Sequence, residues 1–350
     1  MKARLFSVCF ALLIACFVSP YTIKADEIED SIEIKIEATE IDEENKEAIE
    51  GIKGKEAVIE QPAAEKIENI DNGGLLSATA KGWVKSGGKW YYYSTNQGML
   101  KRGIYYIAED AAYYGFWPDG SLVSGGWRKI DVEQYDGSYK QQWVYAGTGS
   151  KLLRGWQKLD GKWYYFNPSC PTAYENGMYT IGGKKYYFNS SCVMRTGWIK
   201  INSTTWMYAD SSGVLASGWK QISGVWYYFN PSNRTMYYGG SYYIGGEKYY
   251  FADSGAMRTG WIKDDYKWYY ATSSGKLATG WQKIGGKWYY FDKDSYDMYW
   301  DDIYEIGGKS YYFKVEGDIY VNGTYYYQTG RDYYWVTVDS NGVITKMEYQ

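Results

Sequence analysis

The chain of 350 residues contains no histidine. That absence excludes histidine-based catalytic triads, histidine metal ligands and histidine acid–base catalysis. No zinc-type cysteine cluster and no phosphate-binding glycine-rich loop stands out. The carboxylates within the repeats, such as Asp210 and Asp253, fall in turns, where local capping accounts for them. The sequence therefore predicts a protein that is not an enzyme and that uses no metal and no cofactor.

Proline is scarce, with 6 residues, and phenylalanine is uncommon, with 10, whereas the chain holds 43 tyrosines and 17 tryptophans. Tyrosine and tryptophan, unlike phenylalanine, combine a large apolar body with a polar tip. This bias favours rings that are partly exposed and available for binding. It is a poor match to a conventional aliphatic core.

Residues 1–25 have the features of a secretory signal peptide. A basic start precedes the apolar run Leu5–Val18, and a plausible cleavage site ends at Ala25. The run of 14 residues is short for a bilayer span. An alternative is that Leu13–Cys16 is a lipoprotein processing box, with Cys16 as the lipidated residue. Either interpretation predicts export.

Residues 26–77 are predicted to form an acidic linker or stalk. Asp26–Asn72 holds 17 acidic and 5 basic residues, a net charge of −12, whereas Gly73–Gln350 has a net charge of +6. Such a segment is expected to be solvated and either disordered or weakly helical. Its isoleucines could instead recognise a partner. The basic residues of the chain are dispersed, so no nucleic-acid partner is expected.

The remaining chain is built on one short unit, which reads GWQKLDGKWYYF at Gly155–Phe166. We interpret it as a β-hairpin with a Gly-Trp strand, a glycine-rich turn and an aromatic returning strand. Because side chains alternate along a strand, Trp163 and Tyr165 share one face. Tyr164 and Phe166 share the other face, which we expect to be the core. Variants begin at Gly82, Gly218 and Gly280.

A longer period overlies the hairpins: the unit recurs after 63 residues at Gly218 and after a further 62 at Gly280. Each block contains three hairpin types. The first type is the unit itself, the second lacks both tryptophans (Met178–Phe188), and the third keeps both and ends in Tyr-Ala (Trp198–Ala209). Alternation of three types predicts an all-β solenoid of hairpins with about three hairpins per turn.

We assign residues 78–350 to this solenoid. Gly82–Arg154 is a looser first block with an insertion around Asp131–Gln142. The terminal segment 333–350 departs from the pattern, and Asn341-Gly342 within it predicts a tight hairpin. This hairpin is expected to act either as an end cap or as a dimerisation element.

At this level of detail the repeats resemble the choline-binding (cell-wall-binding) repeats of Gram-positive surface proteins. The resemblance rests on GWQKLDGKWYYF, GWQKIGGKWYYF and the MRTGW links at Met194–Trp198 and Met257–Trp261, and it covers nearly all of Gly82–Thr329. It implies a left-handed hairpin solenoid with ligand sites between consecutive hairpins. It also implies recognition of phosphocholine on teichoic or lipoteichoic acid, a secreted and cell-wall or cell-surface location, and a homodimer through the C-terminal hairpin.

Aromatic faces are the best partners for a quaternary ammonium, which cannot donate a conventional hydrogen bond. We predict three cages, each made of two tryptophans and a tyrosine from one hairpin and a tryptophan from the next. The junctions into second-type hairpins should be weak, because Met178 or Ser241 replaces the incoming tryptophan and Lys185 or Lys248 replaces the returning one. The predicted cages comprise Trp127, Trp143, Tyr145 and Trp156; Trp198, Trp206, Tyr208 and Trp219; Trp261, Trp268, Tyr270 and Trp281.

Three alternatives remain open at this stage. The tryptophans could simply pack the spine of the solenoid. The chain could be a carbohydrate (glucan)-binding adhesin or a toxin-like receptor-binding module, since related repeats occur in both. The acidic segment could carry the biological activity, with the repeats as its anchor.

Cys170 and Cys192 occupy equivalent places in consecutive hairpins, so they could form a disulfide or remain two thiols.

Overall fold

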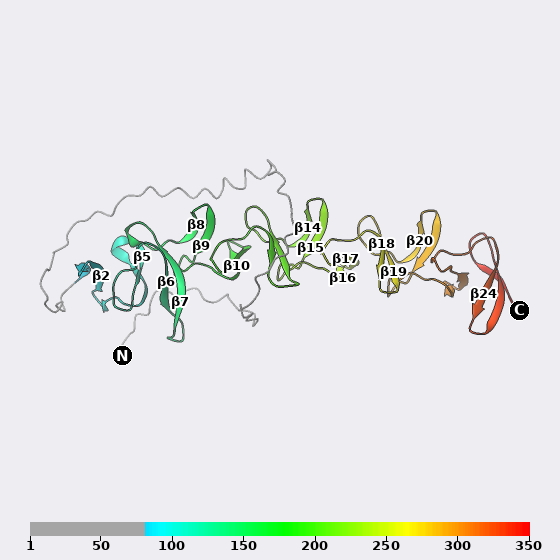
Figure 1. Cartoon of the computed structure of the whole chain (residues 1–350), viewed down its shortest axis with the longest axis horizontal. Helices are drawn as coiled ribbons and strands as arrows, with labels where there is room; N and C mark the ends of the chain where they lie inside the picture. The colour runs from blue at the N-terminus through cyan, green and yellow to red at the C-terminus, as the bar shows by residue number, and fades with distance from the viewer. Residues whose placement is uncertain (1–80) are drawn as a thin grey trace. The chain divides into compact units, whose positions relative to one another are not determined.

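The computed structural model describes residues 81–350. The predicted signal peptide (1–25), with its alternative processing site at Cys16, and the acidic segment (26–77) lie outside the described residues. The chain forms two compact units, one comprising residues 81–197 with Ala209–Leu215 and the other Trp198–Tyr208 with Ala216–Gln350. The structure is all-β apart from two single turns of 3-10 helix, η3 (Ala108–Asp110) and η4 (Thr148–Ser150) (Figure 1). Neither described helix is long and apolar enough to cross a membrane.

Consecutive strands pair as hairpins along the whole described chain. The first strands are β1 (Gly82–Ser86), β2 (Lys89–Ser94), β3 (Gly98–Met99), β4 (Gly103–Ile107), β5 (Ala112–Phe116), β6 (Gly126–Glu133), β7 (Tyr139–Ala146), β8 (Gly155–Leu159), β9 (Lys162–Phe166), β10 (Gly177–Ile181) and β11 (Lys184–Phe188). They are followed by β12 (Gly197–Lys200), β13 (Trp206–Ala209), β14 (Gly218–Ile222), β15 (Val225–Phe229), β16 (Gly240–Ile244), β17 (Glu247–Phe251), β18 (Gly260–Asp264), β19 (Lys267–Ala271), β20 (Gly280–Ile284), β21 (Lys287–Phe291), β22 (Ile303–Ile306), β23 (Lys309–Tyr312), β24 (Gly323–Thr329), β25 (Asp332–Val338) and β26 (Ile344–Tyr349). The predicted all-β array of hairpin repeats is confirmed.

In the hairpins that are closed by a two-residue turn, such as β8–β9, the turn sets the register. In β8–β9 the turn residues Asp160-Gly161 both have positive φ, at 48° and 76°. Two positive φ values are typical of the tight turns whose twist matches that of the flanking strands. Trp156 then lies opposite Tyr165, and Lys158 lies opposite Trp163. These four side chains therefore share one face of the hairpin.

The opposite face is the core, as the alternation of side chains predicted. Tyr164 is 8% exposed and Phe166 is fully buried. The last position of the returning strand is also buried in third-type hairpins, where it is alanine (Ala209, Ala271) and bridges to a leucine in the following linker. The fully buried phenylalanines at this position are Phe116, Phe166, Phe188, Phe229, Phe251 and Phe291.

The first-strand tryptophan of a hairpin packs against the core face of the next hairpin. The ring of Trp156 lies 4.8 Å from that of Tyr186 and 5.9 Å from that of Phe188. Aromatic pairs at this spacing contribute ~0.5–1.5 kcal/mol beyond the burial of area. The same pair of contacts recurs at Trp83, Trp127, Trp198, Trp219, Trp261 and Trp281.

The linkers also join neighbouring hairpins through the backbone. The amide of Met194 donates to the carbonyl of Trp163 in the preceding hairpin at 2.9 Å, and the next amide, Arg195, donates to Tyr187 of its own hairpin at 2.9 Å. Met257 and Arg258 repeat these bonds in the second unit. The MRTGW links are therefore short connectors that hydrogen-bond to two hairpins at once.

The second unit contains two first-type hairpins, three positions apart. Within the second unit, β14–β15 and β20–β21 point to the same side (Figure 1). In the first unit, the insertion around Asp131–Gln142 lengthens the hairpin β6–β7 and does not add a separate element. Ile130 and Val132 on this extension are buried, at 1% and 5% exposure.

The C-terminal end is a three-stranded sheet, β24–β25–β26. Asn341-Gly342 lies in the turn between β25 and β26, so the tight hairpin expected from this dipeptide is present. The additional strand β24 pairs with β25 on its other side. Val336 is fully buried in a cluster with Tyr312 and Val338, which joins this sheet to the preceding hairpin.

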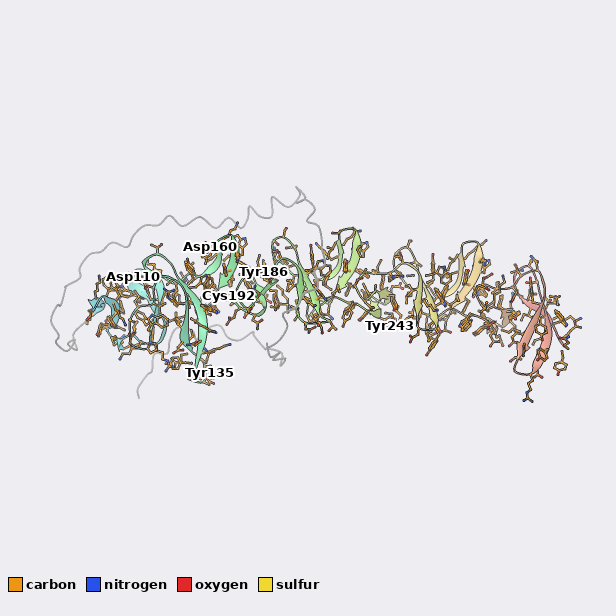
Figure 2. All side chains as sticks on the ribbon, viewed as in Figure 1. Asp110, Tyr135, Asp160, Tyr186, Cys192 and Tyr243 are labelled. Carbon is orange, nitrogen blue, oxygen red and sulfur yellow. The ribbon has the colours of Figure 1, made fainter. Side chains whose placement is uncertain are left out.

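No disulfide joins Cys170 and Cys192 in this structure. Cys192, labelled in Figure 2, is 2% exposed and packs in a cluster with Tyr164 and Phe166. Burial raises the pKa of its thiol to about 12. Cys170 packs against a different cluster, around Val123.

We predict that Gly255→Ala destabilises the second unit. A Cβ at Gly255 would overlap the sulfur and methyl of Met236, and φ is +80°. Overpacking of this kind costs ~1–3 kcal/mol. Urea denaturation followed by tryptophan fluorescence measures the change.

The matched control is Gly246→Ala. Gly246 has φ of +86° but nothing within 4 Å of its Cβ position, so it reports the backbone cost alone. Equal losses in the two variants would show that the Met236 contact has no energetic role. Met236→Ala in the Gly255→Ala background should restore part of the loss.

We also predict that stability falls between pH 10 and pH 12. Burial raises the pKa of Tyr92, Tyr299 and Tyr312 from 10.0 to about 12. The folded state therefore holds these protons more tightly, so the contribution is complete below pH 10 and is lost as the pH rises to 12. Tyrosinate absorbance and near-ultraviolet circular dichroism should change together. Complete ionisation of the tyrosines near pH 10 with an unchanged dichroism spectrum would contradict this.

Candidate functional site

The candidate site is a corner of three rings on the face of a hairpin away from the core. We use the term ring corner for these three rings: the tryptophan of the first strand, the tryptophan of the second strand and the tyrosine that lies opposite the first tryptophan. In hairpin β12–β13, Trp198 lies 6.4 Å from Trp206 and 5.2 Å from Tyr208, with interplanar angles of 85° and 69°. The rings thus meet edge to face and leave a concave aromatic surface.

The structure brings together the same three members of the other two predicted cages. In β6–β7, Trp127 lies 6.3 Å from Trp143 and 5.5 Å from Tyr145. In β18–β19 the separations are 6.2 Å for Trp261 with Trp268 and 5.3 Å for Trp261 with Tyr270.

The fourth member of each predicted cage belongs to the next hairpin. Among residues 81–350, Trp156, Trp219 and Trp281 make no direct ring contact with the preceding ring corner. Each lies in a ring corner of its own hairpin. The direct ring contacts across these junctions come from a tyrosine and a phenylalanine, such as Tyr227 and Phe229 against Trp198.

Sequence reasoning missed the ring corners of the first-type hairpins. Trp219 lies 6.4 Å from Trp226 and 5.1 Å from Tyr228, which matches the geometry of the third-type corners. The two tryptophans of each first-type hairpin are visible in the sequence. A weak site was nevertheless expected there, because a second-type hairpin without tryptophans follows each first-type hairpin. The two other first-type corners are Trp156, Trp163 and Tyr165, and Trp281, Trp288 and Tyr290.

A linker tyrosine distinguishes the two kinds of junction. After β8–β9, the ring of Tyr174 lies 5.0 Å from Tyr165 and stacks at 4.1 Å on Tyr179 of the next hairpin. After third-type hairpins the residue with the same backbone bond is Leu153, Ala216 or Ala278. Third-type junctions therefore lack the tyrosine stack that fills the first-type junctions.

The two tryptophans of a corner differ in exposure. First-strand tryptophans are half-buried because they pack on the next hairpin. Second-strand tryptophans contact the first-strand ring, and Trp226, Trp268 and Trp288 are open to solvent, at 43%, 37% and 42% exposure. Trp143, Trp163 and Trp206 are only partly exposed. The suggestion that tryptophans pack the spine thus describes the first-strand rings, whereas three of the second-strand rings present a free surface.

A lysine ammonium lies beside most of the second-strand tryptophans. Lys200 Nζ is 5.6 Å from the ring centroid of Trp206, and the corresponding lysines of the other two predicted cages are also at 5.6 Å. In the second-type hairpin β16–β17, Lys248 Nζ lies 4.5 Å from Tyr296 and 5.4 Å from Tyr243, which Figure 2 labels. Lys248, which takes the place of the second-strand tryptophan in this hairpin, thus lies against two tyrosine rings.

A polar groove of about 560 Å³ lies elsewhere in the first unit. Amide, hydroxyl and carboxylate groups line it, including Gln142, Asn167, Thr172, Glu175 and Asn176. Such a lining suits hydroxyl-rich ligands better than a quaternary ammonium. Within residues 81–350, no three His, Cys, Asp or Glu side chains gather where they could hold a metal ion.

Two protein-family models match this chain. The choline-binding repeat model matches residues 176–217 and 278–323, and the cell wall binding repeat model matches residues 81–96, 155–169, 217–232, 242–257 and 259–277. No curated protein sequence is significantly similar to the chain.

Solved structures with detectable similarity include three from Streptococcus pneumoniae. Choline binding protein F, solved in the presence of a peptidoglycan analogue, is 26% identical over 76% of this chain and 93% of that chain, with a TM-score of 0.42. CbpJ is 25% identical over 76% and 94%, with a TM-score of 0.39. The choline-binding domain of CbpL is 28% identical over 55% and 98%, with a TM-score of 0.40.

Several matched repeats hold hairpins that carry ring corners. Residues 155–169 and 217–232 hold the corners of β8–β9 and β14–β15, and residues 259–277 hold that of β18–β19. The corner of β6–β7 lies outside the matched residues. Repeats of this kind are binding modules. The chain therefore carries repeats of the choline-binding (cell wall binding) family.

Proposed function

We propose that this chain is an exported, non-enzymatic protein that binds choline on teichoic or lipoteichoic acid of the cell surface. The observation that carries the proposal is the ring corner of the third-type hairpins, whose second tryptophan is exposed in β18–β19 and partly exposed in β6–β7 and β12–β13. Each corner, with the tryptophan of the following hairpin, forms a cage for one quaternary ammonium. Export rests on the sequence of residues 1–25.

The chemistry of the corner matches such a ligand. A quaternary ammonium offers no hydrogen-bond donor, so the faces of Trp206, Trp198 and Tyr208 are its natural partners, each worth ~0.5–2 kcal/mol. Edge-to-face packing holds the rings in place before the ligand arrives. Less ordering is then needed on binding.

The third-type junctions are the strongest candidates. Their small linker residues, Ala216 and Ala278, leave the tyrosine of the corner without the stacked tyrosine found after β8–β9. The incoming hairpin supplies a tryptophan in place of the methionine or serine of the second type. One such site would bind weakly, but several sites on one polymer raise the apparent affinity by ~10²–10⁴.

We predict that Trp206→Ala and Trp268→Ala each remove about one choline site. Trp268 is exposed and Trp206 is partly exposed, and the ring contacts of both lie within their own hairpin, so the fold should persist. Titration with choline by isothermal calorimetry measures the number of sites.

The control is Trp335→Ala, which removes a tryptophan of similar exposure, 43%, outside any ring corner. An unchanged number of sites in Trp206→Ala and Trp268→Ala would remove these corners from the proposal. Trp198→Ala is not a suitable variant, because that ring also packs on Tyr227 and Phe229.

The second candidate function is glycan binding, which the polar groove of the first unit favours. We predict that the full chain is retained on choline-agarose and eluted by free choline. If insoluble glucan retained the chain and choline-agarose did not, glycan binding would become the favoured function and choline binding the less favoured one. Glu175→Ala should then weaken glucan retention, since this residue lines the groove.

A further inference from the structure

The lysines that face the second-strand tryptophans form a regular set. Each lies directly across the hairpin from its tryptophan, as Lys263 does from Trp268. Their Nζ atoms lie 5.6–6.0 Å from the ring centroids, near the outer limit for a cation–π contact. The set comprises Lys85, Lys129, Lys158, Lys200, Lys263 and Lys283.

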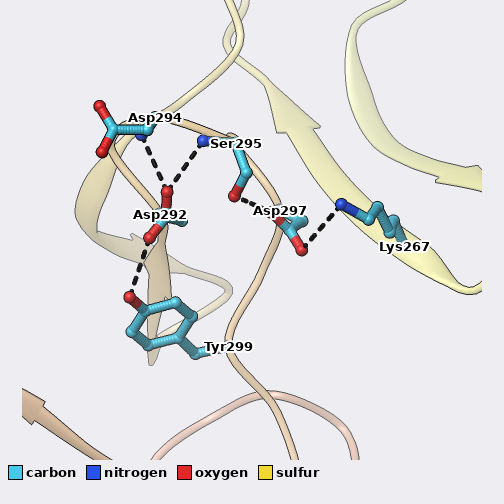
Figure 3. A network of polar contacts seen from close by, with 6 residues as sticks. All are labelled: Lys267, Asp292, Asp294, Ser295, Asp297 and Tyr299. Atoms are coloured by element: carbon cyan, nitrogen blue, oxygen red, sulfur yellow. Dashed lines mark hydrogen bonds and ion pairs between the residues drawn. The ribbon is translucent and has the colours of Figure 1, made fainter.

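Three lysines on the other face of the hairpins are paired with carboxylates. Lys267, four residues from Lys263 on the same hairpin, pairs with Asp297 at 3.5 Å (Figure 3). Lys287 pairs with Asp318 at 3.2 Å, and Lys89 pairs with Asp119 at 2.9 Å. In the described part of the chain, none of the tryptophan-facing lysines forms an ion pair or a hydrogen bond.

An uncompensated ammonium therefore lies at the rim of each predicted cage. A bare quaternary cation entering the cage meets two opposing influences, attraction by the rings and repulsion by this ammonium. A ligand that carries an anion close to its quaternary nitrogen meets no such conflict, because the anion can face the lysine. The charge pattern thus selects a zwitterion over a simple cation.

The chain contains one natural exception. In hairpin β14–β15, Gln221 lies opposite Trp226, and its side-chain amide donates to the carbonyl of Gly224 at 3.2 Å. The ring corner is otherwise the same. The hairpin therefore tolerates glutamine in place of the lysine.

We propose that Lys129, Lys200 and Lys263 are the anion-binding half of the three cages. Each places its ammonium against the phosphate of a choline ester while the rings hold the quaternary nitrogen, with the short ethylene link of the ester between them. The proposal rests on the proposed function and adds its specificity: the site takes phosphate-esterified choline in preference to free choline.

The test uses the full chain with Lys129→Gln, Lys200→Gln and Lys263→Gln combined. Calorimetry gives the dissociation constants of choline and of glycerophosphocholine at low and at physiological salt. The wild-type chain should bind glycerophosphocholine more tightly, and this preference should fall about three- to tenfold in the variant. The affinity for free choline should stay the same or rise. Raising the salt should reduce the preference of the wild-type chain, because exposed charges are screened.

The control variant carries Lys162→Gln, Lys220→Gln and Lys267→Gln, which removes three positive charges from the other face. It should keep the preference of the wild-type chain. Replacement of the three cage lysines by arginine should also keep it, since the charge is retained. Circular dichroism confirms that the variants are folded.

Three results would overturn the proposal. Wild-type chain that binds both ligands equally would refute it while leaving the choline-binding function in place. An equal loss of preference in the cage variant and the control variant would assign the effect to net charge. Failure of the wild-type chain to bind either ligand would refute the proposed function as well.

Discussion

The structure depends on the insertion of a first-strand tryptophan between two hairpins. Trp156 meets Tyr165 of its own hairpin at 5.1 Å and Tyr186 of the next at 4.8 Å. A two-stranded hairpin has only one face to bury and is marginal alone in water. Because this contact recurs from hairpin to hairpin within each unit, the stability of one repeat derives from its neighbours.

The same tryptophan determines what the exposed surface can do. Its inner side is used by packing, and its edge orients the second-strand tryptophan at nearly a right angle. The second ring remains in solvent at Trp226, Trp268 and Trp288, whereas Trp143 also packs against the cluster around Tyr164 and Phe166. One residue pattern thus provides a spine and a binding surface, and the two tryptophans of a repeat are not equivalent.

Lysines recur at a fixed place beside the second-strand tryptophans. On the core-facing side of the hairpins, Lys89, Lys267 and Lys287 are paired with carboxylates from following loops. The lysines on the ring-corner side have no such partner within residues 81–350. A periodic surface of open rings and uncompensated ammonium groups complements a polymer that repeats a quaternary cation and an anion. Many weak contacts along such a polymer add up to firm attachment.

The sequence by itself determined the hairpins, their three types and the face that forms the core. Strand alternation is local, so Phe166 could be assigned to the interior from its position alone. The same alternation placed Trp206 and Tyr208 on one face, because they lie two residues apart along one strand. Trp198 joins them across the connection 201–205.

Only the tertiary structure decided how neighbouring hairpins meet. The sequence predicted that Trp219 completes the cage of the preceding hairpin, whereas the direct ring contacts at that junction come from Tyr227 and Phe229. Whether Trp219 closes the cage over a ligand stays a prediction. The sequence also did not reveal that first-type hairpins carry the same ring corners as third-type hairpins, or which carboxylates pair with individual lysines. Contacts between hairpins depend on the angle between them, which no local pattern encodes.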